Sequence, residues 1–285
     1  MLRSIKIRLY PNKEQATMIN KLLGCYRFVY NQCLSRKIES YRNEGKSENL
    51  STLDKFLHHE LLKDDDFVWL REQNTKVLGQ AVRDMLTAYK NFFERHTGYP
   101  RFKSKHDNRQ SCRFVLGAIS RRNVYTNYKL SLANIRNVNF RCNKKYADYL
   151  QKNHDNIRQA TLTKLPCEEY YLSILVDGDL THNVKESKAS IGIDLGVKDF
   201  VITSDGEAFD NLHFKKSKEK KIKRLQRQLS KKQKGSNNRN KTKVRLAKVS
   251  YLGFQLQTEL ASKEEAKPKY VEGDLFKDAD LISKS

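Results

Sequence analysis

The chain has 285 residues, of which 38% are hydrophobic and 31% are charged, and its net charge is +23. This length suffices for two domains that each have a core. No run of eighteen apolar residues occurs, which excludes a membrane-spanning helix. The first residues form no apolar signal region, so we expect a cytoplasmic protein that is not secreted.

The net charge indicates the class of binding partner, and the cysteines indicate whether disulfides or a zinc site are expected. A charge of +23 exceeds what solubility requires and favours a polyanionic partner. An anionic membrane fits less well, because the most basic helix expected here has no wholly apolar face. The five cysteines are odd in number and form no Cys-x-x-Cys pair, so we expect neither a disulfide framework nor a zinc site.

The chain opens with a strand and continues as helices. Ser4 to Leu9 alternates apolar and basic residues, which predicts a half-buried strand. Asn12 with Gln15 predicts a capping box at the start of a helix. Helical spacing then continues to about Thr97, and its apolar stripes predict a bundle core. The stripes are Leu22, Tyr26, Phe28, Val29 and Cys33, then Leu78, Val82, Met85, Leu86, Tyr89, Phe92 and Phe93.

Gly98-Tyr99-Pro100 ends the helical region, and short alternating runs follow. They predict strands separated by turns, and with the first strand they could form a β-barrel or sandwich into which the helices are inserted. The predicted strands are residues 113–116, 129–132, 137–140 and 170–176.

The segment Ile191 to Phe200 carries the most informative motif. Residues 189–194 predict a buried strand that ends in Asp194, and a second strand, a turn and a third strand follow from Phe200. Nucleases of the RNase H type place their first metal-binding carboxylate at such a strand end, although Mg²⁺ chemistry needs further carboxylates. Actin-like ATPases and sugar kinases share the pattern, but Val197-Lys198 disfavours them. A hairpin whose Asp caps the turn is the structural alternative.

Residues 213–248 form the most basic stretch, with sixteen Lys or Arg residues and one acid, Glu219. The pattern predicts two antiparallel helices joined at residues 235–238. Their apolar stripes are narrow, so we expect the basic faces to stay exposed and to bind nucleic acid. The candidate cations are Lys223, Arg224, Arg227, Lys231, Lys232 and Lys234.

Residues 99–105 interleave aromatic rings with cations, and Arg113 with Phe114 repeats the theme. The rings could stack on unpaired bases while the cations meet phosphates. Alternatively, Tyr and Phe pin this loop to the barrel core. The candidate nucleic-acid contacts are Tyr99, Arg101, Phe102, Lys103, Lys105 and Arg113. His58 and His59 are expected on a helix surface without a metal.

Six segments, in order, resemble the TnpB (OrfB) family of insertion-sequence proteins, the relatives of type V CRISPR nucleases. The resemblance implies an RNA-guided DNA endonuclease of a prokaryotic mobile element, cytoplasmic or nucleoid-associated, with DNA and guide RNA as partners. It also implies a RuvC-like site in which an Asp, a Glu and a second Asp hold Mg²⁺, and Asp194 falls on the first. The segments are residues 7–11, 26–31, 86–93, 99–105, 192–200 and 224–234.

The expected fold class is therefore α+β. We expect a wedge-like β-barrel with an inserted helical bundle, then the N-terminal portion of an RNase H/RuvC-like α/β domain with a basic helical hairpin. The expected domains are the barrel at residues 1–10 plus 99–186, the helical insertion at 11–98, the partial RuvC-like domain at 189–260 with its hairpin at 213–249, and a disordered tail at 261–285.

The family's catalytic Glu, final Asp and zinc module have no counterpart in this sequence. We therefore expect a truncated or frame-disrupted copy that binds nucleic acid with an incomplete catalytic site, and whether it is an enzyme stays open. The alternatives are an active Mg²⁺-dependent DNA endonuclease completed by a separate downstream chain, a remnant without stable function, and an actin-like ATPase or kinase. The sequence predicts no oligomeric state.

Overall fold

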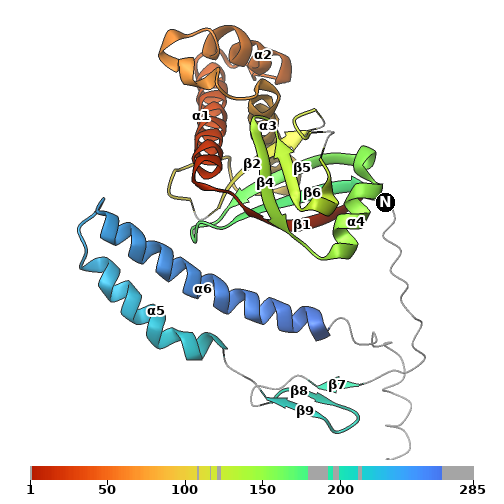
Figure 1. The fold of residues 1–285 in the computed structure, drawn as a ribbon. Coiled ribbons are helices and arrows are strands. Elements are labelled where there is room, and N and C mark those ends of the chain that lie inside the picture. The colour runs from red at the N-terminus through yellow and green to blue at the C-terminus, as the bar shows by residue number, and fades with distance from the viewer. Residues whose placement is uncertain are drawn as a thin grey trace, which may run out of the picture. The chain divides into compact units, whose positions relative to one another are not determined.

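The computed structural model describes residues 2–107, 109–115, 117–120, 123–178, 192–194, 199–210 and 214–264. The chain divides into two compact units, Met1–Thr181 and His182–Ser285, which we describe separately (Figure 1). None of the described helices is long and apolar enough to cross a membrane. The finer division into barrel, insertion, RuvC-like domain and tail stays a prediction.

The first unit contains a six-stranded antiparallel sheet in the order β2-β5-β6-β1-β4-β3. The first strand of the chain lies inside this sheet and pairs with β6 from Leu2↔Asp177 to Leu9↔Tyr170. The strands are β1 (Leu2–Tyr10), β2 (Gln110–Val115), β3 (Lys129–Leu132), β4 (Ile135–Arg141), β5 (Ile157–Lys164) and β6 (Tyr170–Asp177).

This sheet curls into a half-barrel. Its edge strand β3 is bonded to the segment that follows β2, where Ser120 N donates to Ser131 O at 3.2 Å and Ala133 N donates to Ala118 O at 2.6 Å. These bonds satisfy backbone groups that an edge strand would otherwise leave open. The coarse prediction of a mixed helix-and-sheet fold with a curled sheet is therefore confirmed.

Two elements of the sheet region were not predicted. Strand β5 contains a register irregularity between Ile157 and Gln159, which interrupts the two-residue alternation that reveals a strand. Helix α4 (Lys144–Lys152) is short and buries only Ala147 and Leu150, so its apolar stripe is too sparse to detect.

A run of helices lies between β1 and β2, as predicted. It consists of α1 (Lys13–Glu44), α2 (Leu50–Lys55), a π-helical turn (Phe56–Leu61), a 3-10 segment (Asp65–Leu70) and α3 (Thr75–Arg95). The predicted capping box is confirmed, because Gln15 N donates to Asn12 Oδ1 at 2.8 Å and Asn12 N donates to Gln15 Oε1 at 2.9 Å. Gln15 Nε2 also donates to the backbone O of Arg136 in β4, which ties the start of α1 to the sheet.

Most of the predicted bundle core is buried, with one clear exception. Tyr26, Val29, Leu78 and Met85 are all buried. Phe93, however, is 70% exposed, so its prediction as a core residue is wrong. Tyr89 is the last buried residue of α3, and Phe93 follows it by one helical turn.

The second unit contains a three-stranded antiparallel sheet, β7-β8-β9, and a helical hairpin. The strands are β7 (Ile193–Asp194), β8 (Asp199–Thr203) and β9 (Ala208–Asp210), and the helices are α5 (Phe214–Ser230) and α6 (Asn237–Glu264). Residues 189–191 of the first predicted strand lie outside the described residues.

The turns of this unit lie where the sequence predicts them. Gly206 and Gly235 adopt φ values of +79° and +86°, which glycine tolerates without steric cost. Helix α6, however, continues to Glu264, past the predicted end of the hairpin at 249 and into the first residues of the predicted tail. The reason is local, because Gln, Leu, Glu, Ala and Lys dominate this stretch and all favour a helix. Residues 265–285 lie outside the described residues.

Candidate nucleic-acid interface

Four aromatic side chains gather where α3 ends, and we call them the aromatic cluster: Tyr89, Phe92, Phe93 and Tyr99. The Tyr99 ring meets Tyr89 edge-on at 5.5 Å between centroids and meets Phe92 at 5.3 Å. The hydroxyl oxygens of Tyr89 and Tyr99 are 2.7 Å apart. Phe93 lies nearly parallel to Tyr89 at 6.5 Å. The rings therefore hold one another in a fixed arrangement.

Part of this cluster faces outward. Phe93 is 70% exposed and Tyr99 is 48% exposed, and Phe102, three residues after Tyr99, is 55% exposed. Arg95, Arg101 and Lys105, which belong to the same stretch of chain, are exposed as well. Exposed rings beside cations form a surface that can stack on unpaired bases and attract phosphates. Sequence analysis identified Tyr99 and Phe102, but it assigned Phe92 and Phe93 to the core.

The segment after Tyr99 is anchored to a helix. Lys103 N donates to Asn31 Oδ1 at 2.8 Å, and Asn31 Nδ2 donates to Lys103 O at 3.0 Å. Pro100 is buried. Tyr99 therefore pins the loop, as the structural interpretation expects, and its ring is still 48% exposed, while its contact with nucleic acid stays a prediction. The anchors lie on α1 and α3, not in the barrel core.

Two of the predicted cations point inward. The Lys103 ammonium lies 4.0 Å from the ring centroid of Tyr30 and 5.4 Å from that of Tyr26, and loss of water around it lowers its pKa. Arg113 Nη2 forms an ion pair with Asp84 Oδ1 at 2.6 Å. Neither cation is free on the surface, in contrast to Arg101 and Lys105.

Asp84 is a junction that sequence analysis missed. Its second carboxylate oxygen accepts the Tyr26 hydroxyl at 2.6 Å, so this one side chain of α3 connects α1 with Arg113 of β2. Burial, and secondly the negative charge of Asp84, raises the pKa of Tyr26. A single Asp inside an apolar helical stripe could have signalled this role, because a carboxylate there requires a partner.

The basic hairpin uses some of its cations internally. Lys232 Nζ donates to Thr242 Oγ1 at 2.6 Å and to Asn238 O at 3.3 Å. Arg239 donates to the backbone oxygens of Leu229 and Lys232. These bonds hold the turn between α5 and α6 closed. The predicted role of Lys232 at a phosphate therefore competes with a structural one.

The remaining candidate cations of the hairpin are exposed. Arg224, Arg227, Lys231 and Lys234 all face solvent. Lys223 is exposed too, and pairs with Glu219 one turn away at 2.7 Å. Leu225 is buried, whereas Ile222 and Leu229 are only partly covered, as the narrow stripe predicts. The outer face of this hairpin is therefore strongly cationic.

Asp194 lies on the short edge strand β7, where it pairs with Ile202 of β8. Asp194 is exposed and Ile193 is 45% exposed, so the predicted burial of this strand is wrong for its described residues. The physical reason is that β7 has only two residues and one neighbouring strand, so little of its side-chain surface is covered. Gly192 allows a close approach here, because a Cβ would lie 3.3 Å from that of Ser204, which is a tight contact.

A metal site cannot be assembled around Asp194 from the described residues. They contain no group of three or more His, Cys, Asp or Glu side chains that could hold a metal ion. The Asp, Glu and Asp set that a RuvC-like site uses is therefore not brought together in the described part of the chain, and we derive no metal-dependent step.

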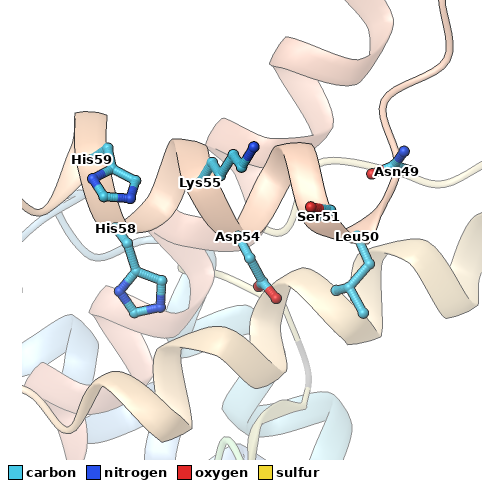
Figure 2. Close-up of a pocket in the computed structure, with 7 residues that line it drawn as sticks. All are labelled: Asn49, Leu50, Ser51, Asp54, Lys55, His58 and His59. Atoms are coloured by element: carbon cyan, nitrogen blue, oxygen red, sulfur yellow. The ribbon is translucent and has the colours of Figure 1, made fainter.

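His58 and His59 line an open surface pocket of about 720 Å³ (Figure 2). Both histidines are exposed, as predicted. Figure 2 shows Asp54 and His58 on the same side of the helix, and Asp54 Oδ2 faces Arg83 Nη2 at 3.9 Å. The arrangement supplies too few ligands for a metal, and we assign it no function.

The five cysteines are free thiols, and all except Cys142 are buried. Burial raises the pKa of Cys25 to about 11 and that of Cys33 to about 12. Such thiols are almost fully protonated near neutral pH, as the prediction of inert core cysteines requires.

Two family models match the chain. A model of the IS605 OrfB group described as "Helix-turn-helix domain" matches residues 1–46, and one described as "Probable transposase" matches residues 172–252. The described residues of the first range, 2–46, form a strand followed by one continuous helix, β1 and α1, and contain no helix-turn-helix.

Curated relatives support the same group. The chain is 28% identical over 248 residues to a "Putative RNA-guided DNA endonuclease" of Streptomyces pristinaespiralis and 27% identical over 248 residues to "Putative RNA-guided DNA endonuclease InsQ" of Escherichia coli (strain K12). These matches cover 87% of this chain but only 59% and 58% of the relatives. "Virulence protein VsdF" of Salmonella dublin is 34% identical over 116 residues, which are 96% of that protein and 37% of this chain.

The similarity of this chain to solved structures is weaker than its similarity to the curated relatives. The chain aligns with "Cryo-EM structure of CRISPR-Cas12f Ternary Complex" at a TM-score of 0.35 and 14% identity, covering 89% of this chain and 58% of that one. It aligns with "Cryo-EM structure of the Cas12f1-sgRNA-target DNA complex" at 0.32 and 14%, covering 91% and 67%. The family assignment therefore depends on the sequence matches: the chain belongs to the transposase-like TnpB/OrfB family of insertion-sequence proteins.

Proposed function

We propose that this chain binds single-stranded nucleic acid as part of an RNA-guided system of a mobile element, with guide RNA and DNA as its partners. The observation that most supports this proposal is the set of exposed rings at the end of α3 and in the loop after it. Phe93 is 70% exposed and Phe102 is 55% exposed. Exposed aromatic side chains beside Arg101 and Lys105 suit stacked bases and their phosphates. The relatives named as RNA-guided DNA endonucleases support this choice of partner.

The exposed cations of the α5–α6 hairpin supply the second contact surface in this proposal. Their charge attracts any phosphate backbone without reading its sequence. The aromatic surface then favours unpaired bases, because bases inside a duplex do not offer their faces. The two surfaces therefore have different roles, one in affinity and one in preference for single strands.

The binding proposal is tested with a labelled single-stranded RNA. The double variant Phe93→Ala with Phe102→Ala is expected to lose about thirtyfold or more in affinity, because two stacked bases at about 1–3 kcal/mol each contribute about 2–6 kcal/mol together. Val124→Ala is the matched control, since Val124 is 44% exposed and lies outside the aromatic cluster. Unchanged affinity of the double variant would overturn the proposed aromatic surface.

We further propose that residues 189–260 form part of a RuvC-like domain whose first carboxylate is Asp194. The β7-β8-β9 meander supports this, because Asp194 ends its first strand. Mg²⁺ would supply water activation and stabilise the leaving oxygen when held with further carboxylates. In a Mg²⁺-dependent cleavage assay with the guide RNA of its own element, guided cutting that is lost in Asp194→Ala supports this role. Cutting that survives Asp194→Ala contradicts it.

A further inference from the structure

Arg27 of α1 lines two pockets, and the smaller one is cationic. This cavity has a volume of about 100 Å³ and lies between α1, residues 103–107 and the start of β2. Its charged lining residues are Arg27, Lys103, Arg109 and Asp107. Three cations against one carboxylate give it a positive balance, and its volume suits one phosphate group.

Two of the three cations of this cavity, Lys103 and Arg27, have no hydrogen-bond acceptor among the described residues, whereas Arg109 Nη2 donates to Thr163 Oγ1 at 3.5 Å. Lys103 Nζ contacts the rings of Tyr30 and Tyr26. The charges of Asp84 and Asp107 act on it, but the described residues give it no hydrogen bond and no ion pair. The Arg27 guanidinium likewise has neither within the described part of the chain. Asp107 is occupied, because its Oδ2 accepts Ser104 N at 2.8 Å. Since a half-buried ammonium without an acceptor is costly, an anion in this cavity would satisfy it.

The larger pocket is aromatic and has a volume of about 420 Å³. Phe28 and Trp69 line it with ring centroids 5.0 Å apart, and Trp69 is 40% exposed. Gly24 also lines this pocket, and a Cβ there would meet only the Arg27 guanidinium, at 4.0 Å. The pocket's one carboxylate, Glu72, pairs with Lys21 at 3.4 Å. An aromatic face and a cation therefore border the same space.

We propose that these two pockets together bind one nucleotide of a single strand, with its phosphate in the Lys103 cavity and its base against Trp69. Arg27 belongs to both linings, so a phosphate and a flat ring of one ligand could lie against the same guanidinium. The inference rests on the proposed binding of single-stranded nucleic acid and adds a specific pocket to it. The phosphate could be a terminal one or one within the backbone, and the chemistry of recognition is the same.

The chain contains one tryptophan, so Trp69 reports on its own pocket. Titration with RNA that carries a 5′-phosphate, and with the same RNA ending in a 5′-hydroxyl, is expected to quench Trp69 fluorescence. Tighter binding of the phosphorylated RNA identifies a terminal phosphate, and equal binding identifies a backbone phosphate. Both results support the pocket. A mobility shift measures total binding in the same samples.

Arg27→Gln and Lys103→Met are each expected to abolish the quenching and to weaken binding roughly tenfold, the lower range of one stacked nucleotide. Lys103→Met keeps an unbranched side chain against Tyr30, and circular dichroism verifies that the variants fold. Lys145→Met, at an exposed lysine of α4, is the charge-matched control. RNA that binds with a constant Trp69 signal would overturn this inference alone, whereas RNA that does not bind would overturn the proposed function as well.

Discussion

Two cations of the first unit and three of the α5–α6 hairpin differ in whether they are available to a partner. In the first unit, Arg113 is paired with Asp84 and Lys103 lies over Tyr30. In the hairpin, Arg224, Arg227 and Lys231 face solvent. A net charge of +23 therefore overstates what a polyanion can contact, because part of it is consumed inside the fold. The hairpin keeps its charge available because it has too little apolar surface to bury.

The largest difference between the first unit and the hairpin is expected in the rate at which a cysteine thiol reacts. Cys25 has its pKa raised from 9.0 to about 11, because burial disfavours the thiolate. At pH 8 its thiolate fraction is therefore about a hundredfold lower than that of an unperturbed thiol, and it rises only as the pH approaches 11. A reporter cysteine in the hairpin, Gln226→Cys, is exposed and should react about a hundredfold faster. Labelling followed by mass spectrometry measures both rates, and equal rates would contradict the contrast.

Removal of the buried junction is expected to cost stability. Asp84→Ala leaves the Arg113 guanidinium and the Tyr26 hydroxyl without their partner, and we expect a loss of about 2 kcal/mol in the free energy of unfolding. Asp84→Asn should lose less, because its amide oxygen still accepts the Tyr26 hydroxyl. Urea unfolding measures both variants. Wild-type stability of Asp84→Ala would mean that the junction contributes nothing.

The exposed hairpin cations are expected to set the salt dependence of binding. Replacing Arg224, Arg227 and Lys231 with Ala should reduce the slope of log K against log salt by about 2, at about 0.7 per contacted phosphate of a single strand. A fourfold rise in salt then weakens the wild type roughly fifteenfold more than the variant. Lys145→Ala is the control, because Lys145 is an exposed lysine of α4 outside the hairpin, and its slope should match the wild type. Equal slopes for the triple variant would remove the hairpin from the interface.

The smallest effect is expected at the surface ion pair of α5. Lys223→Ala breaks only the exposed contact with Glu219, so the free energy of unfolding should change by less than about 0.5 kcal/mol. Thermal unfolding in low salt measures it. A loss comparable to that of Asp84→Ala would show that the two regions do not differ as we describe.

Most helices, strands and turns lie where the sequence predicts them, but the predicted burial or exposure of individual side chains is correct less often. The helix start at Asn12, the turns at Gly206 and Gly235 and the basic hairpin lie where they were predicted. Strand β5 was missed, since a bulge breaks its alternation. Among the candidate contacts, Tyr99 and Arg101 are exposed, whereas Lys103 is folded inward.

The sequence by itself determined the local structure and the overall charge of this protein, together with its family. Caps, turns and helical stripes depend on residues within a few positions of one another, so a linear pattern contains them. Only the tertiary structure decided which charges and rings are available. The Asp84 junction joins Tyr26 and Arg113, which are far apart in the sequence, and Phe93 is exposed although it continues the apolar stripe of α3. Such contacts arise from packing across the fold, and no short pattern encodes them.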